Sequence, residues 1–161
     1  PGAVAPPAPT ATGALAGPAS PAPSGVLKAA VVKEIRAADQ GTFDRVVIEF
    51  QGTFGAWRAG YVPKVTEDGS GDPVSLQGDR FVQVSVQNAT FDNAVQVGDG
   101  VPHAAYTGPH RLSPMLGNVL QIADAGDFEA VLSLGIGLRT QAGLRAYRLE
   151  GPSRLVIDLA H

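Results

Sequence analysis

The sequence contains no cysteine among its 161 residues. Without thiols the chain forms no disulfide, and it offers no thiolate as a nucleophile or metal ligand. This absence suits a protein that folds outside the cytoplasm without disulfides, but many cytosolic proteins also lack cysteine. Cysteine usage is therefore only a weak signal for the cellular compartment.

The chain also lacks basic clusters. Its 12 lysine and arginine residues against 15 acidic residues give a net charge of −3 and a pI of about 5.5. Nucleic-acid-binding domains and membrane-surface domains carry basic patches, so we expect neither partner. Apolar runs are far shorter than the about 20 residues of a membrane-spanning helix. No signal peptide is recognisable, and a membrane link would require a lipid anchor that this chain does not contain.

The first 25 residues carry no charge at all. They hold seven of the 13 prolines and eight alanines. Such a segment buries too little apolar surface to offset the entropy of ordering it. We therefore predict a disordered Pro/Ala-rich linker or tether over 1–25. Residues 26–161 are numerous enough for one domain with its own core.

Two segments with the same pattern frame this domain. Residues 45–50 and 154–159 both read basic, apolar, apolar, apolar, acidic, apolar. Alternation with a period of two predicts half-buried strands. If the strands are neighbours, Arg45 faces Asp158, or Glu49 faces Arg154. Such pairs on an exposed face are each worth about 0.2–1 kcal/mol and chiefly set the register.

Further strands are predicted between turn-forming segments. Residues 26–36 favour a strand over a helix because β-branched residues dominate their second half. Residues 88–118 are irregular, and we expect one short strand around 103–107. The other predicted strands are 56–66, 81–86, 118–123, 129–137 and 144–150, and turn composition occurs at 67–73, 124–127, 139–143 and 151–153. This spacing predicts an all-β, antiparallel β-sandwich of two packed sheets, with the last three strands forming a meander.

No catalytic motif is present: the sequence has no Gly-x-Ser-x-Gly, His-Glu-x-x-His or P-loop. We therefore predict no enzyme, no cofactor and no metal site. The spacing of His103, His110 and His161 matches no zinc pattern. The acidic residues at 67–72 are typical of a flexible loop, although they could supply oxygen ligands to Ca²⁺. Gly135-Ile-Gly137 is interpreted as a bulge or a close approach of two backbones.

The aromatic residues are the main ligand-binding candidates. Trp57 and Tyr61 share one face of a predicted strand, whereas Tyr106 lies close to His110 and Arg111 in the irregular region. Exposed rings flanked by polar groups stack on the apolar faces of sugars. The alternative is that Trp57, the only tryptophan, is a core residue. The hypothesis places a functional surface around 54–61 and 103–111.

Several segments together resemble one family, the AMIN-like domain of actinobacterial lipoproteins. They are Phe43-Asp-Arg-Val-Val-Ile-Glu-Phe50, Asp68-Gly-Ser-Gly71 with Pro73-Val74, Tyr106-Thr-Gly-Pro109, Gly126-Asp-Phe-Glu-Ala-Val-Leu132, Gly135-Ile-Gly-Leu138 and Pro152-Ser-Arg-Leu-Val-Ile-Asp-Leu159. The family is related to the AMIN domain of cell-wall amidases and pilus secretins. The resemblance implies a β-sandwich outside the cytoplasm, tethered through the Pro/Ala segment to a lipidated cysteine. It also implies association with peptidoglycan, and it supplies no catalytic residues.

The resulting functional hypothesis is a non-catalytic domain for binding or targeting to the cell envelope. Its partner would be a cell-wall glycan, such as peptidoglycan, or an envelope protein. One alternative is a small-molecule carrier or hydrolase with a pocket near residues 103–111. Another is a protein–protein interaction module that adds an edge strand to a partner.

Overall fold

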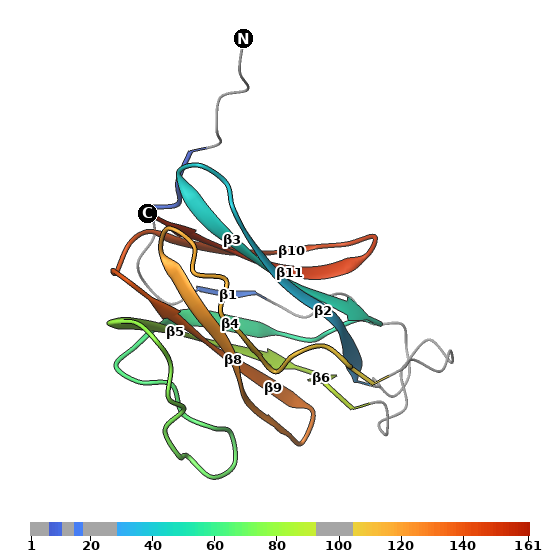
Figure 1. The fold of residues 1–161 in the computed structure, drawn as a ribbon. Helices are drawn as coiled ribbons and strands as arrows, with labels where there is room; N and C mark the ends of the chain where they lie inside the picture. Colours follow the sequence, from blue (N-terminus) through green and yellow to red (C-terminus); the bar gives the residue numbers. More distant parts are fainter. Residues whose placement is uncertain (1–6, 11–14, 18–28, 93–104) are drawn as a thin grey trace.

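The computed structural model describes residues 7–10, 15–17, 29–92 and 105–161. These residues form two β-sheets packed face to face (Figure 1), and the described ranges contain no helix. Among them no helix is long and apolar enough to cross a membrane. The predicted β-sandwich is therefore confirmed, as is the strand rather than a helix after residue 29.

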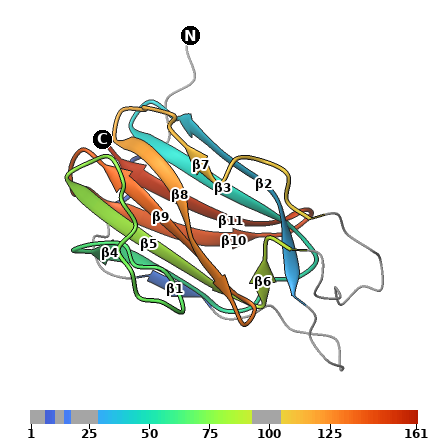
Figure 2. The same ribbon diagram turned by 60° about the horizontal axis from the view of Figure 1, so that its bottom comes forward.

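Within the described residues, sheet A has six strands and sheet B has five. The order in sheet A is β1 (Leu15–Gly17), β4 (Trp57–Val62), β5 (Arg80–Gln87), β9 (Val131–Leu138), β8 (Val119–Phe128) and β7 (Arg111–Leu112). The order in sheet B is β10 (Leu144–Leu149), β11 (Ser153–Ala160), β3 (Phe43–Gln51), β2 (Ala30–Asp39) and β6 (Ala89–Thr90). All pairs are antiparallel except β2 with β6. Figure 2 shows the two layers from a second side.

The matched segments are neighbours in sheet B, as β3 and β11. Their antiparallel register places Arg45 opposite Asp158 and Glu49 opposite Arg154. The alternate residues of both strands are fully buried and meet the inner face of sheet A. They include Val46, Ile48, Leu155 and Ile157. The predicted division of these strands into an apolar face and a charged face is confirmed. The expectation that the charged face is exposed is wrong for its acids, because Asp158 is fully buried and Glu49 is only 7% exposed.

Sheet A contributes the other half of the core. Val82, Val84 and Val86 are buried on the inner face of β5, as their alternation predicted. They pack with the apolar residues of β9, which lies beside β5. Each of these side chains contributes roughly 1.5–3 kcal/mol by its burial. The large shared core explains why the domain needs no disulfide.

Three predictions about the second half of the chain are wrong. Residues 124–127 belong to β8, which passes through a bulge and turns only at Glu129 and Ala130, both with positive φ. Residues 105–107 are not in a strand, whereas 103 and 104 lie outside the described residues. The last three strands form no meander, because β9 lies in sheet A and β10 in sheet B. Alternation marks strands but does not assign them to a sheet.

Part of the predicted linker contacts the domain. β1 pairs with β4, Gly17 lies against the indole of Trp57, and Leu15 packs on the core. Pro9 is buried against Gly143, next to β10. The described residues 7–10 and 15–17 therefore connect the edges of the two sheets. Residues 1–6, 11–14 and 18–25 of the predicted linker lie outside the described residues.

The loop between β4 and β5 covers the outer face of sheet A. Val65 is buried, and the loop forms its own bridge between Thr66 and Pro73. Gly135 leaves room for it, because a Cβ there would lie 2.7 Å from the side chain of Leu76 and 2.8 Å from that of Val65. The interpretation of this glycine pair as a close approach is confirmed. The covering loop creates the candidate site described next.

Candidate functional site

Two of the predicted ligand-binding aromatic residues are tied into the fold. Trp57 is only 7% exposed and belongs to the core, so the core interpretation is the one that holds. The Tyr61 hydroxyl donates to the carbonyl of Ala142 (2.7 Å) and accepts from its N–H (3.0 Å). Burial raises the pKa of Tyr61, against the opposing effect of the Ala142 hydrogen bond. The indole is therefore not available to stack on a sugar.

The other three candidates lie at the far side of sheet A. β7 and β4 are separated by β8, β9 and β5, so the five predicted residues do not form one site. Tyr106 packs on Phe91 and His110, with ring centroids 5.2 and 5.4 Å away, and its hydroxyl donates to the Pro109 carbonyl. Burial raises the pKa of Tyr106, and the negative charge of Glu34 adds to the effect.

His110 and Arg111 have partners that organise neighbouring loops. The His110 ring lies 3.0 Å from the Asp124 carboxylate. Arg111 donates to the Ser75 carbonyl (2.7 Å) and to the Gln121 side chain (2.9 Å). Arg111 thus helps to hold the covering loop on sheet A. Ligand binding by Tyr106, His110 and Arg111 stays a prediction.

A cavity opens on the outer face of sheet A, beside the covering loop. Its volume is about 250 Å³, somewhat below the roughly 300–1,000 Å³ of sites that enclose a drug-sized ligand. We call it the groove. Its lining residues come from β4, β5, β9 and the covering loop, and they are Arg58, Gly60, Tyr61, Val62, Asp68, Gln83, Ser85 and Ser133.

The period of the strands explains why polar residues gather there. Because successive side chains point to opposite faces, the buried valines of β5 place Gln83 and Ser85 on the outer face. Gln83 donates to the Thr66 carbonyl (2.9 Å) and accepts from the Thr66 N–H (3.3 Å). This two-ended contact fixes the start of the covering loop above the sheet.

Asp68 reaches the groove from the tip of the loop. Its backbone N–H donates to the Ala125 carbonyl (2.9 Å), and its carboxylate accepts a hydrogen bond from the fully buried Ser133 hydroxyl. A serine needs an adjacent base to act as a nucleophile. Among the described histidines, His110 pairs with Asp124, and His161 lies beside other carboxylates. We therefore interpret the hydrogen bond from Ser133 as a contact that fixes the Asp68 carboxylate in the groove, where it can accept a hydrogen bond from a ligand.

Arg58 supplies the cation of the groove. It is exposed on β4, and among the described residues its guanidinium has no hydrogen bond or ion pair. An unpaired guanidinium presents five donors in a fork that matches a carboxylate. Together with the Ser85 hydroxyl and the Asp68 carboxylate, it offers donors and acceptors within one small cavity. Such a surface fits a polar ligand with hydroxyl and carboxylate groups.

The loop acids do not assemble as Ca²⁺ ligands. Asp68 accepts from Ser133, and Glu67 accepts from Ser70 (3.1 Å). Within the described ranges, Asp39, Asp44 and His161 are the one group of such residues close enough to share an ion. The Ca²⁺ interpretation of the loop therefore has no support from its geometry.

Sequence reasoning missed Arg58, Ser85 and Ser133. The signal was available for Arg58 and Ser85, because each alternates with a core residue of its own strand. Ser133 lies in a strand that is buried on both faces, so no alternation singles it out. The groove also depends on the path of the loop, which strand patterns do not specify.

The comparison with known families agrees with this fold. A family model, the AMIN-like domain, matches residues 30–161. The chain belongs to the AMIN-like family. No curated protein and no solved structure matches it. The match begins at the first residue of β2 and runs to His161, so it includes the groove. Membership in the AMIN-like family supports a general association with the cell envelope.

The two alternative functions would involve different parts of the fold. A pocket near 103–111 would involve residues 103 and 104, which lie outside the described residues. β10 is the longest of the four edge strands in the described residues, the others being β1, β6 and β7, so an added strand could pair with it. Part of this strand already borders the N-terminal segment, because Leu144, Arg145 and Ala146 line a cavity with Pro9 and Leu15.

Proposed function

We propose that this AMIN-like domain is a non-catalytic module that binds a cell-wall glycan through the groove. The proposal rests mainly on Arg58. Its exposed guanidinium lines the groove and has no partner among the described residues, so it is suited to bind an anionic group of a ligand. A wall polymer such as peptidoglycan offers hydroxyl, amide and carboxylate groups along its length. Arginine recognises a carboxylate through two parallel hydrogen bonds.

The size of the groove sets how much of the polymer it takes. A cavity of about 250 Å³ suits one sugar ring or one short side chain of a polymer. Asp68 and Ser85 then supply an acceptor and a hydroxyl for the groups around that ring. Affinity for a single repeat would be modest. A polymer with many repeats would still retain the domain, because it presents the same weak site at a high local density.

We further propose that the domain works outside the cytoplasm on an envelope-anchored protein. Family membership supports the envelope, and the uncharged Pro/Ala-rich composition of 1–25 supports a spacer of which 7–10 and 15–17 lie against the domain. An envelope protein as the partner is the second candidate of the same class. Fractionation of cells that produce the native protein tests the location, and recovery in the cytosolic fraction would contradict it.

Co-sedimentation with purified peptidoglycan tests the ligand. The 1–161 chain is expected to pellet with the polymer, whereas Arg58→Ala should bind roughly 10-fold more weakly. That loss corresponds to about 1.4 kcal/mol, close to the lower value for a hydrogen bond to a charged group. Ser85→Ala should weaken binding less, because it removes one neutral hydroxyl.

Arg154→Ala is the matched control, since it removes the same charge from sheet B and should bind like the wild type. Failure of the wild-type chain to pellet above an unrelated control protein would remove the glycan hypothesis. If Arg58→Ala binds as well as the wild type, the glycan remains the ligand but the groove is excluded as its binding site.

A further inference from the structure

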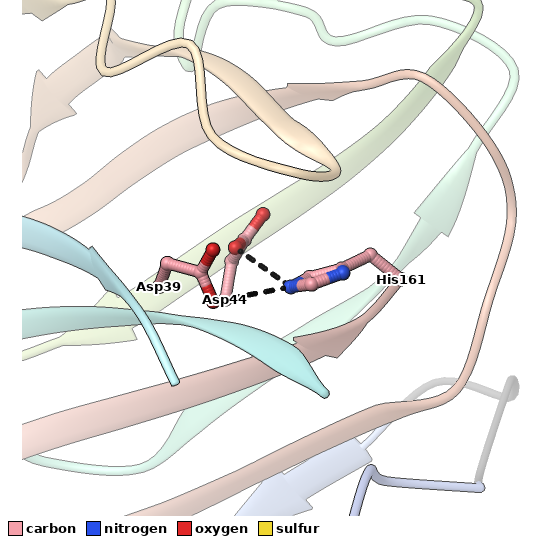
Figure 3. Close-up of side chains that lie close together, drawn as sticks. All are labelled: Asp39, Asp44 and His161. Carbon is pink, nitrogen blue, oxygen red and sulfur yellow. Dashed lines mark ion pairs between the residues drawn. The ribbon is translucent and has the colours of Figure 1, made fainter. Parts of the chain in front are cut away.

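Three polar side chains meet at one end of sheet B, away from the groove. Asp39 is the last residue of β2, Asp44 follows in β3 after a short turn, and His161 comes directly after β11. β2, β3 and β11 are neighbours, so their ends bring the three residues together (Figure 3). One ligand atom of each lies within 4.8 Å of the others.

The two carboxylates face each other across the strand pair. Asp39 is directly opposite Asp44 in the β2–β3 register. Like charges in directly opposed positions destabilise a sheet. A positive charge beside both would offset this cost, and the His161 ring lies next to both carboxylates (Figure 3).

Asp44 provides separate evidence that an ion binds here. Its side chain is fully buried, and Oδ2 accepts the backbone N–H groups of Asn118 (2.7 Å) and Val119 (2.8 Å). Its other oxygen, Oδ1, is buried and has no hydrogen-bond donor. A buried carboxylate oxygen without a donor is costly, so it calls for a partner. This oxygen is the one that faces the His161 ring.

The distances fit a metal ion better than a hydrogen-bonded ion pair. His161 Nε2 lies 3.4 Å from Asp39 Oδ1 and 3.4 Å from Asp44 Oδ1. A charged N–H···O hydrogen bond is about 2.7–2.9 Å long. By contrast, atoms bound at about 2.1 Å to a tetrahedral metal lie about 3.4 Å from one another. Both nitrogen–oxygen separations already have the length of a tetrahedral edge.

Neighbouring groups orient the three side chains. The Gly41 N–H donates to Asp39 Oδ1 (2.6 Å), and the two N–H groups at the start of β8 hold Asp44. The His161 ring lies on Gly117, where a Cβ would be 2.8 Å from it. Such outer contacts fix the direction of metal ligands and are typical of protein metal sites.

We propose that Asp39, Asp44 and His161 bind a divalent transition-metal ion, of which Zn²⁺ fits best. An imidazole with two carboxylates favours zinc over Ca²⁺ and Mg²⁺, which prefer sets made only of oxygen ligands. Three protein ligands leave a fourth position for water or for a group from a partner. The ion joins the ends of three strands of sheet B, and through Asp44 it also links them to β8 of sheet A.

Metal titration of the untagged 1–161 chain, first treated with EDTA, tests this proposal. Calorimetry should show one Zn²⁺ per chain. At a zinc concentration 100 times the Kd, the melting temperature should rise by roughly 5–10 °C. Co²⁺ in the same site should give the strong visible absorption of four-coordinate cobalt, which reports the coordination directly.

Two variants decide whether these residues are the ligands. Asp44→Asn and His161→Gln should each weaken Zn²⁺ binding at least about 10-fold, and at the same zinc concentration they should reduce the thermal shift to about half or less. His110→Gln is the matched control, because it removes a histidine that also lies beside a carboxylate, and it should bind zinc like the wild type. Full binding by His161→Gln, no shift in the wild type, or an equal shift with Ca²⁺ would each overturn the proposal.

Discussion

Two aspartates in sheet B have the same burial and opposite surroundings. Asp44 and Asp158 both have fully buried side chains. Asp158 receives hydrogen bonds from Arg45 at both oxygens (2.7 and 3.0 Å) and from Arg145 at one of them (2.7 and 3.2 Å). Asp44 has two N–H donors on one oxygen and none on the other.

The difference separates a structural charge from a candidate ligand. Two guanidinium groups repay the cost of burying Asp158, and Arg45 is held in turn by the Tyr147 hydroxyl (2.9 Å). The hydrogen bond to Asp158 raises the pKa of Arg45 further, so the guanidinium stays charged. No such saturation exists at Asp44. A buried carboxylate marks a site only where part of its hydrogen-bonding capacity is left over.

The largest predicted effect compares asparagine at these two positions. Asp158→Asn removes the charge that two arginines bind, so we expect a loss of about 3 kcal/mol in the free energy of unfolding. Asp44→Asn keeps an oxygen for Asn118 and Val119 and puts an amide toward Asp39, so the loss should stay below about 1 kcal/mol. Urea denaturation in EDTA measures both values.

Equal losses in the two variants would contradict this difference between the aspartates. A larger loss in Asp44→Asn in the absence of metal would contradict it too, because Oδ1 would then contribute to the stability of the fold. An unchanged m-value in both variants is the control, since it shows that the same surface is exposed on unfolding.

Sequence patterns predicted the sandwich but not its connections. The match between residues 45–50 and 154–159 identified β3 and β11, and it placed Arg45 opposite Asp158. The same match predicted an ion pair between Glu49 and Arg154. The two residues are opposite one another in the register, but they form no ion pair. Glu49 binds Lys33 and Arg36 instead, and Arg154 donates to the Pro152 carbonyl. Matching strand patterns predict which residues are opposite one another. They do not predict which ion pairs form, because a long side chain can reach several partners.

Neither candidate site could be read from spacing. Asp39 and Asp44 are close in the sequence, but His161 joins them only because β11 lies beside β3. The groove likewise needs the covering loop to place Asp68 over Ser133. The predicted aromatic site rested on a shared strand face, and for Trp57 that face is the core. Sites built from distant segments require the sheet order, which local periodicity does not contain.

Acidification should cause a smaller loss of stability through Glu49, which lies on the outer face of sheet B. Burial opposes ionisation of Glu49, but hydrogen bonds from Lys33 and Arg36 outweigh it and lower the pKa of Glu49 below its ordinary 4.5. A lowered carboxyl pKa contributes stability that is present above pH 4.5 and is lost as the pH falls through the folded-state pKa. Both cations are largely exposed, so each pair is worth roughly 0.2–1 kcal/mol.

Glu49→Gln measures this contribution directly. At pH 7 the variant should be about 1 kcal/mol less stable than the wild type, and this gap should close as the pH falls below 4.5. Urea titrations at several pH values provide the measurement. A gap that persists at low pH would assign the role of Glu49 to packing rather than to its charge.

The smallest effect is expected at Arg154, the counterpart of Arg45 in the matched strands. Arg45 binds a fully buried carboxylate, whereas Arg154 faces Glu49 in the register and donates only to backbone carbonyls of the turn before it. Arg154→Ala should therefore change stability by less than about 0.5 kcal/mol, and Arg45→Ala should cost about 1–2 kcal/mol while Arg145 still holds Asp158. Urea denaturation of the two variants side by side is the test. Equal losses would mean that position in the sheet, rather than saturation of a buried aspartate, sets the value of an arginine on this face.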